Sequence, residues 1–139
     1  MLHALCAAIW LLVSLQAPPA DKNLSVVVQE ISRTGATASG QPIDPPAGAE
    51  VITSIYTIAP GAVLPDHKHR FPRYAYVLAG RLQVTNAESG EVFTYEAGAF
   101  IVEMIDTWHR GSNIGSEPVR LLVIDQVERG SSNTIVKTP

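Results

Sequence analysis

Residues 61–80 read GAVLPDHKHRFPRYAYVLAG, and this stretch decides the fold. It holds two of the four histidines of the chain, His67 and His69. In an extended strand these side chains project from the same face, with about 7 Å between their Cα atoms. Two imidazoles placed in this way can share one metal ion. His109, on a neighbouring strand, could supply a third ligand and leave the remaining coordination positions open for substrate or oxygen.

The spacing of residues 61–80 resembles the first motif of the cupin superfamily, G-x5-H-x-H-x3-E-x6-G. Residues 98–113 resemble the second motif, G-x5-P-x-G-x2-H-x3-N, after a gap of 17 residues that suits one hairpin. The resemblance implies an all-β fold, a single antiparallel jelly-roll barrel of the cupin type, with a divalent metal bound by three histidines. The matching positions are Gly61, His67, His69 and Gly80 in the first motif and Gly98, His109 and Asn113 in the second.

The remaining pattern also favours an all-β domain. Segments rich in β-branched and aromatic residues alternate with turn signals about every 8 to 12 residues, and helical periodicity is absent after the first twenty residues. Residues 33–48 are rich in Gly, Ala, Thr and Pro and predict a loop. We expect an N-terminal strand and loop over 21–48, a barrel over 49–130 and a tail over 131–139 with one apolar run at 134–136. The expected strands are 24–31, at an edge or in a dimer contact, then 51–59, 73–78, 81–85, 91–95, 99–103, 107–112 and 119–127.

Composition limits the possible functions. The 139 residues are 46% hydrophobic and 17% charged, which suits one compact domain, and a net charge of −3 gives no reason to expect nucleic acid as a partner. The single cysteine, Cys6, lies in the apolar leader, so the mature chain needs no disulfide and has no thiolate for catalysis or zinc binding. The elbow G-x-S-x-G and the zinc motif H-E-x-x-H are also absent.

Residues 1–20 differ in kind from the rest. Residues 2–15 are almost wholly apolar and carry no Lys, Arg, Asp or Glu, and the sequence QAPPA follows. This pattern predicts a signal peptide over 1–20 that is removed on export, so the protein is expected in the periplasm or secreted, without stable membrane insertion. An uncleaved anchor and a misassigned start codon are the alternatives.

Arg73 stands where the cupin motif has a glutamate ligand, and Met104 and Asp106 also depart from the second motif. A positive charge about 6 Å from a divalent ion costs on the order of 5 kcal/mol at an effective dielectric constant of about 20. Arg73 therefore either holds an anion between itself and the metal, as a catalytic residue that orients an anionic substrate, or pairs at the barrel rim with an acid such as Glu103 or Asp66.

Neutral imidazole suits several metals, so the three histidines do not select one. The resemblance implies a six-coordinate ion, and Fe(II) is the first expectation, with Zn, Mn or Ni as alternatives. Glu103 or Asp106 could add a carboxylate as a fourth ligand, and Tyr74 would take the glutamate position only if the spacer were one residue longer. The simpler alternative is that the histidines are hydrogen-bonded polar residues in a barrel mouth.

Two functions follow from these expectations. The first is a non-haem iron dioxygenase or related oxidoreductase that acts on a small anionic organic substrate. The second is a non-catalytic small-molecule or metal-binding cupin of the cell envelope. Either would use the same three histidines, and either is expected to form a homodimer.

Overall fold

The computed structural model describes residues 26–138, so the predicted signal peptide lies outside the described residues. Every regular element in this range is a β-strand, and no helix long and apolar enough to cross a membrane is found there. The strands are β1 (Glu50–Ile58), β2 (His67–His69), β3 (Arg73–Ala79), β4 (Arg81–Asn86), β5 (Val92–Glu96), β6 (Phe100–Val102), β7 (His109–Asn113), β8 (Val119–Val127) and β9 (Thr134–Val136).

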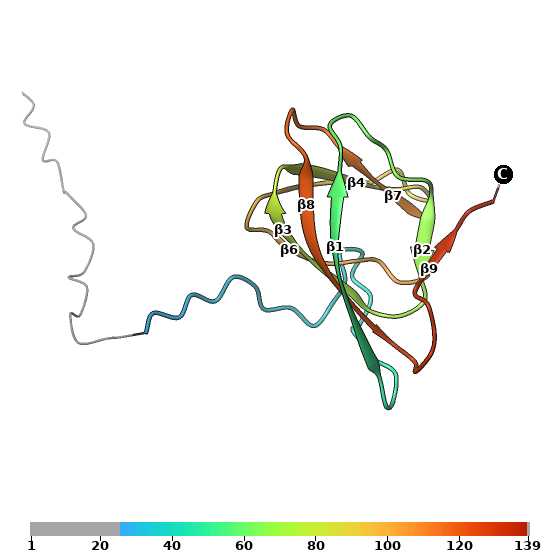
Figure 1. Ribbon diagram of the computed structural model, residues 1–139. Coiled ribbons are helices and arrows are strands. Elements are labelled where there is room, and N and C mark those ends of the chain that lie inside the picture. Colours follow the sequence, from blue (N-terminus) through green and yellow to red (C-terminus); the bar gives the residue numbers. More distant parts are fainter. Residues whose placement is uncertain (1–25, 139) are drawn as a thin grey trace, which may run out of the picture.

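These strands form two antiparallel sheets that face each other (Figure 1). One sheet has the order β1-β8-β3-β6 and the other the order β5-β4-β7-β2-β9. Neighbours in the sheets are often distant in sequence, since β8 lies between β1 and β3 and β7 lies between β4 and β2. This crossing topology confirms the predicted all-β jelly-roll barrel.

The core lies between the two sheets and follows from the alternation of side chains along each strand. On β3 and β8 every second residue is buried, including Val77, Val119 and Val123, each at most 1% exposed. Ile101 from β6 and Met104 just after it complete this centre. Burial of such a side chain contributes about 1.5–3 kcal/mol, so the apolar positions of these strands supply much of the stability.

Gly80 joins β3 to β4 in a tight turn that needs glycine. Its φ is +82°, in the left-handed region that other residues rarely adopt. A Cβ atom there would also lie 2.8 Å from the carbonyl oxygen of Pro118 and 2.8 Å from the Cα of Val119. The turn therefore fixes the start of β4 against the start of β8.

The strand expected at 24–31 is not observed where the structure describes this segment. Residues 26–33 have no strand assignment and are exposed, and Val27 and Val28 are both 87% exposed. The prediction was wrong because an apolar, β-branched segment forms a strand only where a sheet edge accepts it, and residues 26–33 pair with no sheet edge among residues 26–138. The predicted loop over 33–48 does lie against the barrel, where the Gln41 side chain hydrogen-bonds to both the backbone oxygen and the backbone nitrogen of Ile105.

The C-terminal residues 131–139 do more than form a tail. Their apolar run forms β9, which pairs antiparallel with β2 from His67↔Val136 to His69↔Thr134. A backbone hydrogen bond of 2.8 Å from Lys137 to Asp66 extends this pairing. The C-terminal strand therefore covers the edge of the strand that carries two of the three predicted ligands.

Candidate metal centre

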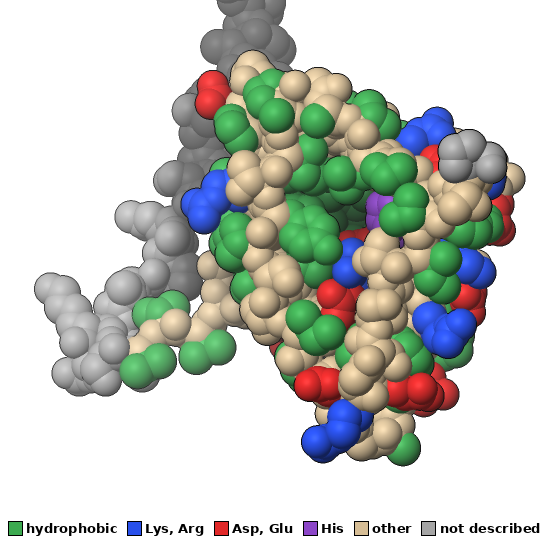
Figure 2. Space-filling view, turned by 45° about the vertical axis from the view of Figure 1, so that its right-hand side comes forward, with side chains coloured by type: hydrophobic (Ala, Val, Ile, Leu, Met, Phe, Trp, Pro, Cys, Tyr) green, Lys and Arg blue, Asp and Glu red, His purple; other side chains and the backbone are tan. Residues whose placement is uncertain are grey.

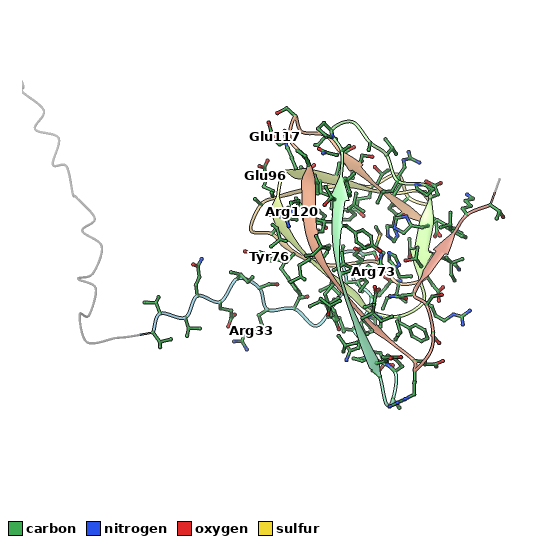
Figure 3. All side chains as sticks on the ribbon, in the orientation of Figure 1. Arg33, Arg73, Tyr76, Glu96, Glu117 and Arg120 are labelled. Atoms are coloured by element: carbon green, nitrogen blue, oxygen red, sulfur yellow. The ribbon has the colours of Figure 1, made fainter. Side chains whose placement is uncertain are left out.

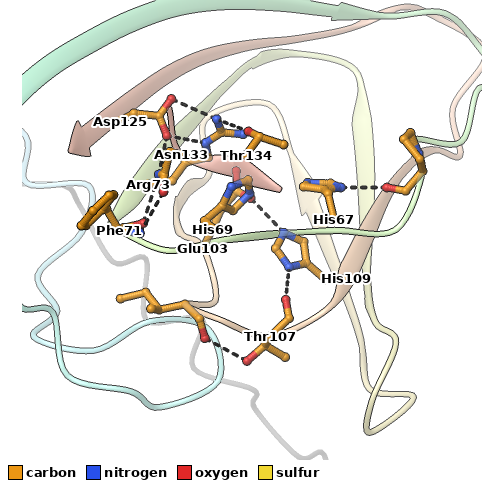
Figure 4. A network of polar contacts seen from close by, with 12 residues as sticks. His67, His69, Phe71, Arg73, Glu103, Thr107, His109, Asp125, Asn133 and Thr134 are labelled. Carbon is orange, nitrogen blue, oxygen red and sulfur yellow. Dashed lines mark hydrogen bonds and ion pairs between the residues drawn. The ribbon is translucent and has the colours of Figure 1, made fainter. Parts of the chain in front are cut away.

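The structure brings the three histidines together inside the barrel. His67 and His69 point inward from β2, and His109 on β7 lies directly opposite His67 in the strand pairing. Their ring centroids are 4.6 to 5.0 Å apart, and the three residues are 7%, 0% and 1% exposed in sequence order. Figure 4 shows the rings around a common centre. The period-2 alternation of β2 and the register of β2 with β7 together produce this convergence.

A carboxylate completes the cluster, and it comes from Glu103. Its Oε2 atom lies 3.0 Å from Nε2 of His69 and 3.3 Å from Nε2 of His109. One ligand atom from each of the four residues lies within 4.8 Å of the other three. Glu103 follows β6 directly, and its backbone nitrogen donates to the backbone oxygen of Arg73 at 2.9 Å. The carboxylate therefore comes from the residue after β6, the neighbour of β3, and not from the β3 position that the cupin motif assigns to a glutamate.

Hydrogen bonds to the backbone fix two of the imidazoles for metal binding. Nδ1 of His67 donates to the Pro65 carbonyl and Nδ1 of His109 donates to the Thr107 carbonyl, both at 2.8 Å. A proton held on Nδ1 leaves a lone pair on Nε2, which is the tautomer of a metal ligand with an oriented second nitrogen. In both cases the backbone carbonyl two residues before the histidine therefore fixes the tautomer that can bind a cation.

The charges at the centre also favour the binding of a cation. Burial, only partly offset by the Pro65 hydrogen bond, lowers the pKa of His67 to about 4, so this ring is neutral at pH 7. Burial works against the charge of Glu103, but the contacts of its carboxylate with the rings of His109 and His69 and the nearby charge of Arg73 outweigh it and hold the pKa of Glu103 below the ordinary value. Nδ1 of His69 is buried with no hydrogen-bond partner among the described residues.

A carboxylate oxygen and imidazole lone pairs therefore lie close together in a buried space that holds too few protons to satisfy all of these acceptors. A divalent ion fits such a donor set. Nitrogen and oxygen ligands of this kind suit Fe, Mn, Zn and Ni, and the donor set does not choose among them.

Arg73 points into the barrel but is ion-paired with Asp125, which corrects the expectation that Glu103 or Asp66 would be its partner. Nε donates to Oδ1 of Asp125 at 2.7 Å and Nη2 donates to Oδ2 at 2.9 Å, and Nη2 also donates to the Thr134 hydroxyl at 2.9 Å. Burial opposes the charge, but the hydrogen bond to Asp125 and the nearby carboxylates outweigh it and raise the pKa of Arg73. Asp66 instead pairs with Arg110 at 3.2 Å.

The other proposed ligands lie elsewhere. Asp106 forms an ion pair with Lys68 at 3.2 Å and is 60% exposed in its side chain. The hydroxyl of Tyr74 donates to Gln126 on the outer side of the sheet, away from the histidines. Neither residue belongs to the cluster of possible ligand atoms.

A hollow opens beside the histidines (Figure 2). It measures about 360 Å³ including its open mouth, and its walls are mostly apolar. An adjoining hollow of about 380 Å³, again counted to its mouth, shares four lining residues with it and extends to β9. The shared residues are Tyr56, Leu64, His67 and Arg73. The possible metal site therefore borders a space that a small molecule could enter.

A family model described as "Cupin domain" matches residues 54–125, more than half of the chain. The protein belongs to the cupin family. No curated protein sequence matches this cupin. Among solved structures it is similar to an oxalate decarboxylase–formate complex from Lactobacillus farciminis, with 27% identity and a TM-score of 0.53 over 62% of this chain and 26% of that one.

A mutant oxalate decarboxylase from Bacillus subtilis matches with 26% identity and a TM-score of 0.53, over 62% of this chain and 23% of that one. A structure of DMSP lyases matches with 15% identity and a TM-score of 0.54, over 63% of this chain and 44% of that one, and shows likeness of fold alone. The cupin thus spans about a quarter of the length of the oxalate decarboxylase chains.

Sequence reasoning missed the partners of Arg73. Asp125 is the one acidic residue at an inward position of β8, where its neighbours on the same face are Val123 and Val127. An acid at a position that the alternation assigns to the core is a signal of a buried ion pair, because a lone buried carboxylate is costly. Asn133 adds to the pair by donating to Asp125 at 2.6 Å.

Proposed function

We propose that this cupin is a metal-dependent enzyme that acts on a small organic carboxylate. His67, His69, His109 and Glu103 would hold one divalent ion. The observation that carries the proposal is that three of these donors, His67, Glu103 and His109, border the same hollow as the buried guanidinium of Arg73. A site for a metal and a site for an anion lie in one small space, which is the arrangement that recognition of a carboxylate needs.

Arg73 has hydrogen-bonding capacity left for a ligand. Its Nε and Nη2 atoms bond to Asp125 and Thr134, while Nη1 has no acceptor among the described residues. The side chain lines both hollows although the residue is only 5% exposed. A carboxylate bound there would accept from Nη1, and such charge-assisted bonds are about twice as strong as neutral ones.

The charges of the site support a ligand with one negative charge. Asp125 balances Arg73, and Glu103 offsets one of the two charges of a divalent ion. A single positive charge is left over, and a carboxylate would neutralise it. The apolar walls, among them Leu64, Leu82 and Leu121, favour a substrate whose remaining part is short and hydrocarbon-like.

When bound, the ion supplies Lewis acidity and, in the case of iron or manganese, redox chemistry. The chain's own residues do the rest. Arg73 orients the carboxylate, Asp125 and Thr134 hold the guanidinium in place, and the backbone carbonyls of Pro65 and Thr107 keep protons on Nδ1 of two ligands. The leucines of the hollow exclude water from the substrate.

The similar oxalate decarboxylases support both the metal and the carboxylate. The Lactobacillus farciminis structure is a formate complex, and a Bacillus subtilis oxalate decarboxylase has Mn(II) centres. The iron dioxygenase expected from the sequence is one form of this proposal, and a manganese-dependent decarboxylase is the other. The donor set fits both metals.

The test is turnover of short carboxylates by the purified protein reconstituted separately with Fe(II) and Mn(II). We expect oxygen consumption or release of carbon dioxide with at least one short acid, and loss of this turnover in His109→Ala. Reconstituted protein that binds carboxylates without turnover would be a non-catalytic binding cupin, and the enzyme proposal would fail.

We also propose that the protein is exported. The support is the apolar pattern of residues 1–20. N-terminal sequencing of protein recovered from outside the cytoplasm should begin near residue 21. Recovery of the intact N-terminus from the cytoplasm would contradict export.

A further inference from the structure

Strand β9 lies outside the part of the chain that matches the family model. The match covers residues 54–125, whereas β9 is formed by Thr134–Val136. This strand stands at the end of the five-stranded sheet, next to β2. Neither of the two cupin motifs, at residues 61–80 and 98–113, includes any residue of β9. What β9 contributes to the site is therefore not given by membership of the family.

The pairing of β9 with β2 extends the strand face that carries two of the possible metal ligands. Val136 lies directly opposite His67. Thr134 lies directly opposite His69. Directly opposed residues of an antiparallel pair project from the same face, with Cβ atoms about 4.5–5.5 Å apart. Because both histidines point into the barrel, Val136 and Thr134 project to the inside as well, whereas Ile135 between them projects to the outside.

Hydrogen bonds hold the start of β9 in a fixed position relative to Arg73. The Thr134 hydroxyl accepts a hydrogen bond of 2.9 Å from Nη2 of Arg73 (Figure 4). The side chain of Asn133, which is 3% exposed, accepts from the backbone nitrogen of Phe71 at 2.8 Å and donates to the backbone oxygen of the same residue at 3.0 Å. Displacement of β9 would leave these buried groups without partners, which is costly. The strand and the guanidinium are therefore positioned together.

Val136 is an inward-facing apolar side chain that nothing covers among residues 26–138. It is 51% exposed, although inward positions of a barrel are normally buried. The space in front of it is the wider of the two hollows, which is lined by Tyr56 of β1, by Arg73 and by Thr134 and Val136 of β9. Figure 3 shows Arg73 between β1 and β9. Since β1 and β9 are each the last strand of a sheet, this hollow opens between the edges of the two sheets.

We propose that β9 determines which carboxylates the site accepts. Thr134 is a positioning residue for the guanidinium of Arg73, and Val136 limits the length of the hydrocarbon part of the substrate. This inference rests on the proposed binding of a carboxylate by Arg73. Cα atoms two residues apart on a strand are separated by about 6.8 Å, a distance covered by about four or five carbon–carbon bonds of about 1.5 Å each. A carboxylate beside Thr134 therefore reaches Val136 with a chain of about five carbons.

Calorimetry of the Mn(II)-reconstituted protein with acetate, butyrate and hexanoate tests the proposal without relying on turnover. Val136→Ala widens the hollow and Val136→Phe narrows it, while Thr134→Val keeps the shape of the side chain and removes its hydroxyl. The matched controls are Ile135→Ala and Ile135→Phe, which make comparable changes at the neighbouring position, where the side chain projects outward. Circular dichroism and the Mn(II) stoichiometry confirm that each variant is folded and loaded.

The variants are expected to have different effects on the three acids. The wild-type protein should bind butyrate more tightly than hexanoate. Val136→Ala should improve the affinity for hexanoate relative to butyrate at least about tenfold, and Val136→Phe should weaken butyrate relative to acetate at least about tenfold, since one methylene in an apolar pocket changes discrimination by about 10- to 200-fold. Thr134→Val should weaken all three acids alike, by about threefold to tenfold, because it loosens the guanidinium and leaves the hydrocarbon pocket intact.

The same titrations separate a failure of this inference from a failure of the proposed function. If the loaded wild-type protein binds none of the three acids, the proposed carboxylate site fails and the role of β9 fails with it. If the wild-type protein binds acetate but prefers hexanoate to butyrate, or if the Val136 variants keep the wild-type affinity ratios, only the role of β9 is overturned. An equal shift in the Ile135 controls would overturn it too. If Val136→Phe does not fold, Val136→Ala decides, because that side chain is already half exposed.

Discussion

Replacement of Asp125 by Asn is expected to destabilise the protein strongly, because it removes the carboxylate to which the buried Arg73 guanidinium is hydrogen-bonded. Arg73 and Asp125 are each 5% exposed, and two hydrogen bonds of 2.7 and 2.9 Å join them. Loss of one partner from a buried pair typically costs about 3–5 kcal/mol, since the remaining charge stays desolvated. Asn fills the same volume, so a cavity does not contribute to the change.

The size of this effect separates a buried pair from a surface pair. We expect Asp125→Asn to lower the free energy of unfolding by about 3 kcal/mol. The matched control is Asp66→Asn, whose pair with Arg110 is 43% exposed on the arginine side and 25% on the aspartate side. Exposed pairs contribute less than about 1 kcal/mol.

Urea unfolding of the metal-free proteins, followed by circular dichroism, measures both changes. The double variant Arg73→Met/Asp125→Leu should recover most of the lost stability, because apolar residues of similar volume often replace a buried pair at little cost. A loss below about 1 kcal/mol for Asp125→Asn would refute the buried, desolvated pair and with it the fixed position of Arg73.

Three further changes test other parts of the structure. The pKa of His67 is about 4 in the folded protein, whereas an unfolded histidine binds a proton below about pH 6.5. The free energy of unfolding of the metal-free protein should therefore fall as the pH falls from about 6.5 towards about 4. A free energy of unfolding by urea that stays constant over this range would contradict a neutral ring. Glu103→Gln removes a charged ligand and should weaken Mn(II) binding at least about tenfold by calorimetry; unchanged affinity would exclude it as a ligand. Gly80→Ala should lower the free energy of unfolding by more than about 2 kcal/mol, because its Cβ would meet backbone atoms. Gly90→Ala, which has a similar φ but open space around the Cβ position, should lower it by about 1–2 kcal/mol. Equal losses of stability in the two variants would contradict the steric argument.

The sequence was sufficient for the parts of the fold that depend on local alternation. The strands at 51–59 and 119–127 are β1 and β8 to within one residue, because both have long β-branched patterns. The two histidines of β2 share a face for the same local reason. Their closeness to His109 depends on the register of β2 with β7, which motif spacing indicated but alternation alone could not supply.

The parts that the sequence did not predict depend on contacts between distant strands. The partner of Arg73 lies 52 positions further along the chain, and only the pairing of β3 with β8 places the two residues opposite each other. The sequence offered Glu103 and Asp106 as possible carboxylate ligands, and the pairing of β3 with β6 brings Glu103 to the cluster. Residues 24–31 were predicted as a strand because their composition is typical of one, but composition does not say which sheet edge would accept them.

Binding of Mn(II) to the purified, metal-depleted protein tests the central claim most directly. Titration calorimetry, with native mass spectrometry for the stoichiometry, should show one ion per chain and a loss of binding in His67→Ala and in His109→Ala. Asp106→Ala serves as the control, since that carboxylate lies outside the cluster and should leave binding unchanged. Absence of binding by the wild-type protein, or equal binding by all four proteins, would contradict a metal centre built from these residues.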